Sequence, residues 1–455
     1  MLLARVRHRI AAGYVIWLWV AIAVLLALTF KPVVESDGAY YFAYLHAVVV
    51  DHTFNLATEL PRVYSIDPRV PIGSAVLSLP AYLVALLIRG ASRPVFDSYY
   101  TTAFVIASLL YGLLALAISH QMAARVTGSA KAAAIGLAAG ALTTPFVYYL
   151  LYEPSYSHTF SAFASASFLY TWWRSRDRSV AGWLWLGALG GLMSVVRFQD
   201  VALMAIVLLD LPRARWRVLL MIPTAALVFT PQLLVDLAQW GTLLPQRSVG
   251  KELTPLPGHY IDVLLSSHNG LFVWHPALLG AAVGLATLRD KRLLSAAVIA
   301  FVLETAIGGA VPDWPGGFAF GGRRFLALTP FFVVGFAQLA HRMRPMVAWA
   351  ATAAFSAWNV VLMANLTYVV VGDRDPGYLP LLLGQVRALA YVPREFVQGG
   401  VVRDLLLWPV LGLPFRPAAG VVLLALEVVC AAIFVWLFVR TTSRATSLTA
   451  AGPDV

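Results

Sequence analysis

Long apolar runs separated by short polar segments cover most of the chain. Each run is long enough, or nearly so, to cross a bilayer as a helix, which takes about 20 residues. The run at 199–212 is short and is expected to tilt or to meet a thinner membrane. The pattern therefore predicts an all-α, multi-span integral membrane protein with about 12–13 apolar helices and short interfacial helices in the outer loops. The predicted spans are 12–30, 101–119, 132–151, 158–173, 180–196, 199–212, 218–238, 271–288, 293–310, 325–340, 346–368 and 417–439.

One further apolar run, 71–90, conflicts with the alternation of successive loops between the two sides of the membrane. If it crossed the membrane once, every later loop would change sides. Pro71, Gly73 and Pro80 instead favour a re-entrant or surface-lying helical segment that packs on protein.

The charged residues fix the orientation of the spans. Hydrophobic residues make up 60% of the 455 residues, charged residues 12%, and the net charge is +11. The basic residues gather in short loops on one side, whereas most acidic residues fall on the other. This is the positive-inside pattern, and it needs no nucleic acid to explain it. We predict that both termini are cytoplasmic. The lone Cys430 excludes an intramolecular disulfide.

The chain shows no fixed-period repeat and no linker, so we expect a single transmembrane domain over 1–455. The expected outer segments are 31–70, 239–270, 311–324 and 369–416. The cytoplasmic loops are too short to form a nucleotide-binding domain, and no phosphate-binding loop sequence of the G-x-x-x-x-G-K-[ST] type is present. Any chemistry is therefore expected at the outer face or within the membrane.

The first outer segment contains "ESDGAYYFAYL" at 35–45. Asp37 and Gly38 suit the start of a short helix, with Asp37 as its cap. The tyrosines that follow fit an aromatic belt at the membrane interface. A purely structural interpretation of this acidic segment is thus open.

Several short pieces, in this order, resemble the GT-C superfamily of integral-membrane glycosyltransferases. These pieces are "ESDGAYYFAYL" (35–45), "RVTGSAK" (125–131), "TTPFVYYLLYEPSYSH" (143–158), "MSVVRFQDVALM" (193–204), "NGLFVWHPALL" (269–279) and "FAFGGRRFLALTPFF" (318–332). The superfamily includes protein O-mannosyltransferases, lipid A aminoarabinose transferases and arabinosyltransferases. The resemblance implies transfer of a sugar, with inversion, from a polyprenyl-phosphate donor to a hydroxyl of a glycan, lipid or protein. It also implies an active site on the outer face of a bacterial inner or plasma membrane.

By this resemblance Asp37 matches the catalytic acidic position, and we assign it as the general base. Glu35 is the second candidate, because many relatives have two adjacent acids where Ser36 separates the two here. Tyr41 and Asp51, in the same outer segment, are candidate contacts for the acceptor or the sugar.

The donor phosphate gains negative charge as its bond to the sugar breaks, so a cationic site is expected. Arg323 and Arg324 lie at the outer end of a predicted span and are the first candidates. Arginine binds two phosphate oxygens with its planar fork. The alternative is that both side chains snorkel to lipid headgroups. Arg247 and Lys251, in the 239–270 loop, are further candidate phosphate ligands.

The piece "YEPSYSH" holds Glu153 and His158 where relatives often have an aspartate. Glu153 is a candidate for holding the acceptor or a metal, with a solvated residue at a helix start as the alternative. His158 is a candidate for the phosphate or an acceptor hydroxyl. The departure from the family argues against its metal site, so we predict no metal and no cofactor. His259, His268 and Trp314 are candidate sugar or acceptor contacts, and Trp314 equally suits the aromatic belt.

Arg197 and Asp200 stand close together at the end of a span and are expected to pair with each other. Glu304 and Glu427 lie within apolar runs, where a carboxyl group is costly and suggests a function. They support an alternative, a secondary transporter or lipid flippase. A second alternative is a polymerase or ligase of surface polysaccharide.

Overall fold

The computed structural model describes most of the chain between Phe30 and Val397. The described residues are 30–31, 33–54, 56, 70–90, 96–243, 256, 258–317, 319–370 and 375–397. Within these ranges the chain forms helices and turns but no strand, which confirms the predicted all-α class. Some predicted features lie outside the described residues, namely the span at 417–439, all but Phe30 of the span at 12–30, Arg247, Lys251, Glu427 and Cys430.

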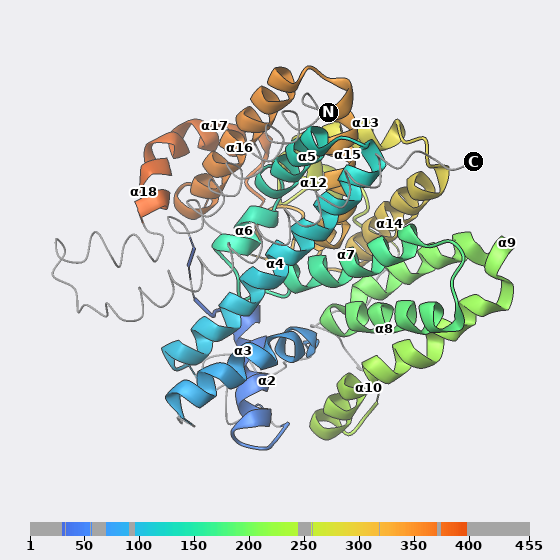
Figure 1. Cartoon of the computed structure of the whole chain (residues 1–455). Helices are drawn as coiled ribbons and strands as arrows, with labels where there is room; N and C mark the ends of the chain where they lie inside the picture. The colour runs from blue at the N-terminus through green and yellow to red at the C-terminus, as the bar shows by residue number, and fades with distance from the viewer. Residues whose placement is uncertain are drawn as a thin grey trace, which may run out of the picture.

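The helices of the described part follow the predicted apolar runs closely (Figure 1). The first half contains α2 (Asp37–Val49), α3 (Gly73–Arg89), α4 (Ser98–Thr127), α5 (Ala130–Leu142), α6 (Phe146–Leu151), α7 (His158–Arg174), α8 (Val180–Val196), η1 (Phe198–Asp210), α9 (Leu211–Ala214), η2 (Arg215–Leu220) and α10 (Met221–Trp240). The second half contains α11 (Asp262–Leu265), α12 (Leu271–Trp274), α13 (Ala277–Ala286), α14 (Lys291–Ala310), η4 (Arg323–Leu328), α15 (Thr329–Arg342), α16 (Pro345–Tyr368), α17 (Tyr378–Ala388), η5 (Leu389–Tyr391) and α18 (Val392–Val397).

Helix α4 is the long central element, and Figure 1 shows it running from the end near α2 and α3 to the end near α5. It packs against α3, α5, α7 and α15. Helix α15 is buried along most of its length between α4, α5 and α13. Small residues allow this close approach: a side chain at Gly284 would collide with the backbone of Gly335, and one at Gly136 with Ala337.

Two predicted spans are each broken into two helices. The run at 132–151 is interrupted between α5 and α6, where Pro145 precedes the second helix. Asn359 donates hydrogen bonds of 2.9 Å to the carbonyl oxygens of Leu142 and Thr144, which the break leaves without helical partners. The run at 271–288 is interrupted between α12 and α13, next to Pro276. Proline removes a backbone donor and clashes with the preceding turn, which explains both breaks.

The ambiguous run at 71–90 forms α3, a helix of 17 residues with Pro80 inside it. One face of α3 packs on α4 and α2, and buries Tyr82 and Ala85. The other face exposes Leu87 and Ile88. The structure therefore shows a helix packed on protein, while its re-entrant or surface-lying placement in the membrane stays a prediction.

Helix α2 differs from its prediction in two respects. Asp37 is the first residue of the helix, and the cap position is occupied by Ser36 at φ 52°, whose side chain makes no capping hydrogen bond. Tyr41 and Tyr44 are only 7% and 3% exposed, packed in the protein core. The aromatic-belt interpretation is therefore wrong for these two residues, because α2 is enclosed by protein and does not present this face to lipid.

Five helical stretches of the described chain are long and apolar enough to cross a membrane, which supports an integral membrane protein. They are Tyr99–Thr127, Phe198–Trp240, Lys291–Ala310, Arg323–Arg342 and Pro345–Tyr368. The second stretch contains the short span predicted at 199–212 and the span predicted at 218–238, and between them Arg215 adopts a positive φ of 51°.

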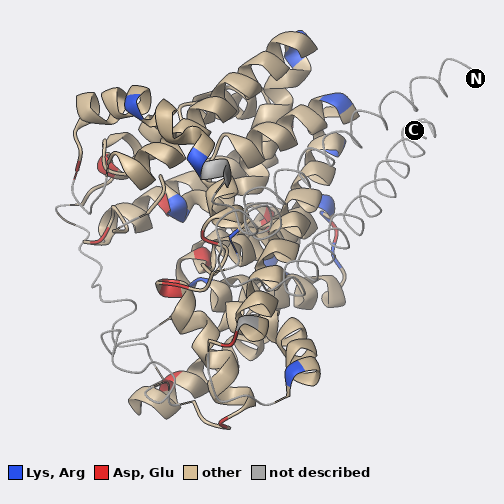
Figure 2. Ribbon diagram, turned by 90° about the vertical axis from the view of Figure 1, so that its left-hand side faces the viewer, with Lys and Arg blue, Asp and Glu red and all other residues tan. Residues whose placement is uncertain are grey.

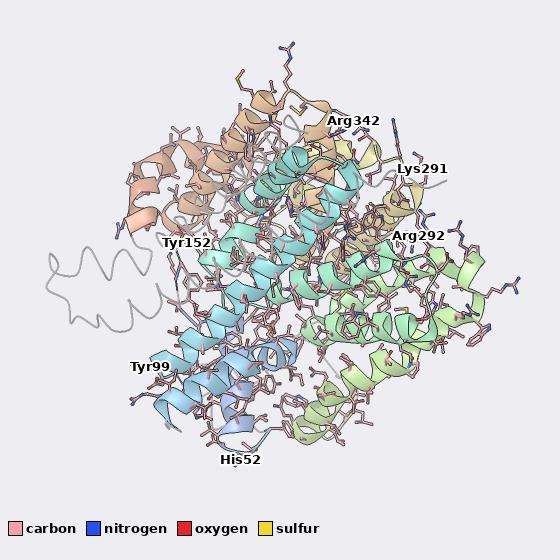
Figure 3. All side chains as sticks on the ribbon, in the orientation of Figure 1. His52, Tyr99, Tyr152, Lys291, Arg292 and Arg342 are labelled. Carbon is pink, nitrogen blue, oxygen red and sulfur yellow. The ribbon has the colours of Figure 1, made fainter. Side chains whose placement is uncertain are left out.

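Charge is distributed unevenly along the molecule. In Figure 2 most acidic residues lie in the left-hand and lower parts, whereas many basic residues lie at the top and along the right-hand edge. Figure 3 shows Lys291, Arg292 and Arg342 near one end of the molecule and His52 and Tyr99 at the opposite end. This agrees with the predicted grouping of basic loops on one side.

Candidate active site

A cavity of about 380 Å³ brings several of the predicted site residues together. The start of α2, the start of α7, the start of η1, the end of α14 and η4 all contribute to its wall. The lining residues are Asp37, Tyr41, Pro71, Ser157, His158, Arg197, Phe198, Gln199, Val201, Ile307, Val311, Asp313, Arg323 and Arg324. The structure thus gathers charged groups from three parts of the chain that are far apart in the sequence, namely Asp37, Arg197, and the 311–324 segment with Asp313, Arg323 and Arg324.

The acidic segment is fixed in position by the turn between α6 and α7. Ser155 Oγ lies 3.4 Å from both the backbone N and the backbone O of Glu35. A side chain at Gly38 would collide with Ser155, so only glycine allows this contact. Asp37 lines the cavity and Glu35 does not. This placement favours Asp37 over Glu35 as the predicted base.

Arg323 faces Asp37 across the cavity. Its Nη1 atom lies 3.7 Å from Asp37 Oδ2, and its Nη2 atom donates a hydrogen bond of 2.9 Å to the carbonyl oxygen of Gly316. The guanidinium also lies 5.3 Å from the centre of the Tyr156 ring. These contacts hold the cation inside the protein, which does not fit the alternative of snorkelling to lipid headgroups.

Arg324 is held on the same wall by the 311–324 segment. Its Nη2 atom donates to the carbonyl oxygen of Asp313 at 2.7 Å and lies 3.6 Å from the Asp313 carboxylate. The Arg324 side chain is 18% exposed. Two adjacent arginines therefore face one cavity, each with one carboxylate nearby, and a bound phosphate would meet both.

The sequence did not identify Arg197 as a site residue, and the expected pair of Arg197 with Asp200 is wrong. Arg197 Nη1 lies 2.6 Å from His158 Nδ1, and Arg197 Nη2 donates to Gln199. Asp200 is fully buried and accepts a hydrogen bond of 2.6 Å from Ser161. Arg197 is in an extended conformation just before η1, whereas Asp200 is in the first turn and faces α7. The two side chains therefore point to different partners.

His158 accepts a hydrogen bond from Arg197, and this contact fixes the protonation of its imidazole ring. An arginine has donors only, so the Nδ1 atom of His158 must act as an acceptor at 2.6 Å. The ring is then neutral and carries its proton on Nε2. His158 also packs against Tyr149, with ring centres 4.3 Å apart. A neutral imidazole on the cavity suits a hydroxyl of the substrate better than it suits a phosphate.

Glu153 lies in the turn between α6 and α7, close to the acidic segment but outside the cavity lining. Its Oε2 atom is buried and has no hydrogen-bond partner among the described residues. Burial and the nearby Glu35 carboxylate raise the pKa of Glu153 to about 8. The predicted solvated carboxylate is therefore wrong, because the group is largely enclosed.

The raised pKa of Glu153 predicts a pH-dependent stability. In the unfolded chain the carboxyl loses its proton near pH 4.3, about the ordinary value for glutamate. Between this pH and about 8 the folded state retains the proton, so stability falls as pH rises through the window. Glu153→Gln should flatten this fall, measured as the difference in Tm between about pH 6 and pH 8.5. An unchanged difference in the variant would contradict the assignment.

The remaining predicted contacts lie away from the cavity lining. His259 stacks on Trp314 with ring centres 5.4 Å apart, and His268 meets the same indole at 6.0 Å. His259 is also paired with Asp262 at 2.8 Å. Both imidazoles thus pack against the indole, and none of the three side chains lines the cavity. Asp51 is exposed just beyond the end of α2.

No cluster of three or more metal-binding side chains occurs among the described residues. The prediction that the protein holds no metal stays a prediction.

Comparisons with known proteins rest on structure alone. No protein-family model matches the sequence, and no curated protein matches it significantly. Two crystal structures of ArnT from Cupriavidus metallidurans, one in the apo state and one bound to undecaprenyl phosphate, align with 95% of this chain. The apo structure aligns over 77% of its own length, with 15% identity and a TM-score of 0.56. The bound structure aligns over 78% of its length, with 16% identity and a TM-score of 0.56. The chain therefore has the multi-span, all-α GT-C fold of ArnT.

Proposed function

We propose that the protein transfers a sugar from a polyprenyl-phosphate donor to an acceptor hydroxyl. The observation that carries this proposal is the single cavity in which the Asp37 carboxylate faces Arg323, with Arg324 and Arg197 on the same wall. A carboxylate beside a cluster of arginines fits a reaction that removes a proton at one point and releases a phosphate at another. The undecaprenyl phosphate bound to one ArnT structure supports a lipid phosphate as the leaving group.

Each residue would have a distinct role in this reaction. Asp37 accepts the proton of the acceptor hydroxyl while that oxygen forms a bond to the anomeric carbon. The bond between this carbon and the phosphate oxygen breaks, and the electron pair leaves with the phosphate. Arg323 and Arg324 stabilise the charge that develops on it. Attack from the face opposite the leaving phosphate inverts the anomeric centre, as in inverting glycosidases.

The neutral His158 and the buried Tyr41 line the same cavity and supply hydrogen bonds for the sugar or the acceptor. Burial, more than the nearby Asp37 carboxylate, raises the pKa of the Tyr41 phenol. Tyr41 is therefore a neutral donor rather than a base. In this proposal the cavity opens at the outer face, because its lining residues Ile307 and Val311 stand at the opposite end of α14 from the basic residue Lys291.

A binding experiment tests the donor class. Purified protein should bind undecaprenyl phosphate measurably, and should bind undecaprenol, the same lipid without the phosphate, at least about tenfold more weakly. Equal affinity for the two lipids would mean that the arginines do not bind the phosphate, and the proposed function would fail.

A further inference from the structure

The side chain of Gln199 joins three elements on the cavity wall. Its Oε1 atom accepts a hydrogen bond of 3.1 Å from Arg197 Nη2. Its Nε2 atom donates to Glu304 Oε2 at 2.9 Å and to the backbone carbonyl of Arg324 at 3.2 Å. One amide therefore connects the start of η1 with α14 and with η4.

The chemistry of the partners fixes the orientation of this amide. Arginine has donors only, so the oxygen of Gln199 must face Arg197. A backbone carbonyl only accepts, so the nitrogen must face Arg324 and, on the same side, Glu304. A flipped amide would lose its bonds to Arg197 and Arg324. Only one orientation of the Gln199 amide therefore satisfies all of its hydrogen-bond partners.

Among the described residues, Gln199 supplies the one hydrogen bond that the Glu304 carboxyl group receives. It lies within the apolar helix α14 and is only 1% exposed. Its Oε1 atom has no hydrogen-bond partner among the described residues, and its Oε2 atom accepts from Gln199. A buried carboxyl group is costly unless it is hydrogen-bonded. The bond to Gln199 therefore gives this residue a structural partner beside the cavity.

We propose that Gln199 and Glu304 are positioning residues for the donor phosphate site. Gln199 holds the Arg197 guanidinium and the Arg324 backbone against the cavity, and Glu304 anchors Gln199. This inference rests on the proposed function and deepens it. It also assigns Glu304 a role that needs an acceptor oxygen but no transfer of a proton, unlike the coupling site of a transporter.

Exchanging the two side chains tests the proposal. Glu304→Gln keeps an oxygen that accepts from Gln199, so the Kd for undecaprenyl phosphate should stay within about threefold of the wild type. Gln199→Glu removes the amide that donates to Glu304 and to the Arg324 carbonyl, and the Kd should rise about tenfold or more. In the double variant Gln199→Glu/Glu304→Gln, the new amide at 304 donates to the new carboxylate at 199, whereas the bond to the Arg324 carbonyl stays lost. Part of the lost affinity should therefore return.

A chemically matched control lies on α10. Gln232 Nε2 donates to Asp236 at 2.9 Å, both side chains are buried, and neither lines the cavity. Gln232→Glu removes the equivalent amide donor to a buried carboxyl group there. It should lower Tm but leave the Kd for undecaprenyl phosphate, measured on folded protein, within about threefold of the wild type.

Two outcomes would overturn the inference while the proposed function survives. One is a double variant that binds no better than Gln199→Glu. The other is a Glu304→Gln variant that binds as weakly as Gln199→Glu. A wild-type protein that does not prefer undecaprenyl phosphate over undecaprenol would instead overturn the proposed function, and the positioning role with it.

Discussion

Asp37→Asn should lower the rate of sugar transfer about 10²–10⁴-fold, because asparagine cannot accept the proton of the acceptor hydroxyl. Binding of undecaprenyl phosphate should not weaken. The Asp37 carboxylate lies 3.7 Å from Arg323 Nη1, so it competes with a phosphate for this cation. Removing the carboxylate frees Arg323, and the Kd should stay the same or fall. The measurements are turnover of a polyprenyl-phosphate sugar and direct binding of the lipid phosphate.

In Asp37→Asn, turnover should fall while binding of the lipid phosphate does not weaken. This difference separates a catalytic role of Asp37 from a role in positioning Arg323. If Asp37 only held Arg323 in place, binding and turnover would weaken together. Glu35→Gln is the companion variant, since Glu35 lies outside the cavity lining, and it should retain most of the activity. Loss of turnover in Glu35→Gln but not in Asp37→Asn would move the base to Glu35. Asp177→Asn, in an exposed turn after α7, controls for the substitution itself.

Arg323→Ala should weaken undecaprenyl phosphate binding and lower kcat/KM about 10²–10³-fold. The Arg323 guanidinium is the cavity cation that faces Asp37, so its loss removes charge where the donor phosphate is expected. Arg323→Lys should recover only part of the loss, because lysine lacks the planar fork that binds two oxygens. Binding isotherms and initial rates at several donor concentrations would measure both effects.

Arg342→Ala is the matched control for this variant. Arg323 and Arg342 stand at the two ends of the same apolar stretch, Arg323–Arg342. Arg342 binds Gln338 and the carbonyl oxygen of Thr287, far along the helix from the cavity. The Arg342→Ala variant should therefore leave donor binding unchanged. Equal losses in the two variants would mean that the effect comes from the stability of the helix, not from a phosphate site.

Hydropathy predicted the helical class because each span must satisfy its own backbone in lipid. It did not show where the helices break, since an apolar run with an internal proline still scores as continuous. Pro145 and Pro276 stand at the two breaks, so proline was the available signal. The hydrogen bonds from Asn359 that support one break come from a distant helix, and a local pattern cannot reveal them.

The cavity was predictable in part. Asp37, Arg323 and Arg324 were chosen by resemblance and charge, and the structure places them around one cavity, although their roles stay predictions. Arg197 was assigned to its neighbour Asp200 because both carry charge and stand three residues apart. Their directions depend on a change of backbone conformation at the start of η1, which charge does not encode.

Gln199 was missed for a different reason. It has no charge, and its neighbours in the sequence give no sign that its partners lie on α14 and η4. Glu304 stands out in the sequence because a carboxyl group in an apolar run is unusual. Its hydrogen-bond partner Gln199 cannot be predicted from the sequence, because the contact requires the start of η1 to lie beside α14.

The most direct test of the central claim is release of polyprenyl phosphate by the purified wild-type protein. A panel of polyprenyl-phosphate sugars would be incubated with the protein and with candidate acceptors, and the freed lipid phosphate quantified alongside Asp37→Asn. We expect release from at least one donor by the wild type and little or none by the variant. Equal release by folded wild type and folded Asp37→Asn would contradict the assignment of this cavity as the active site.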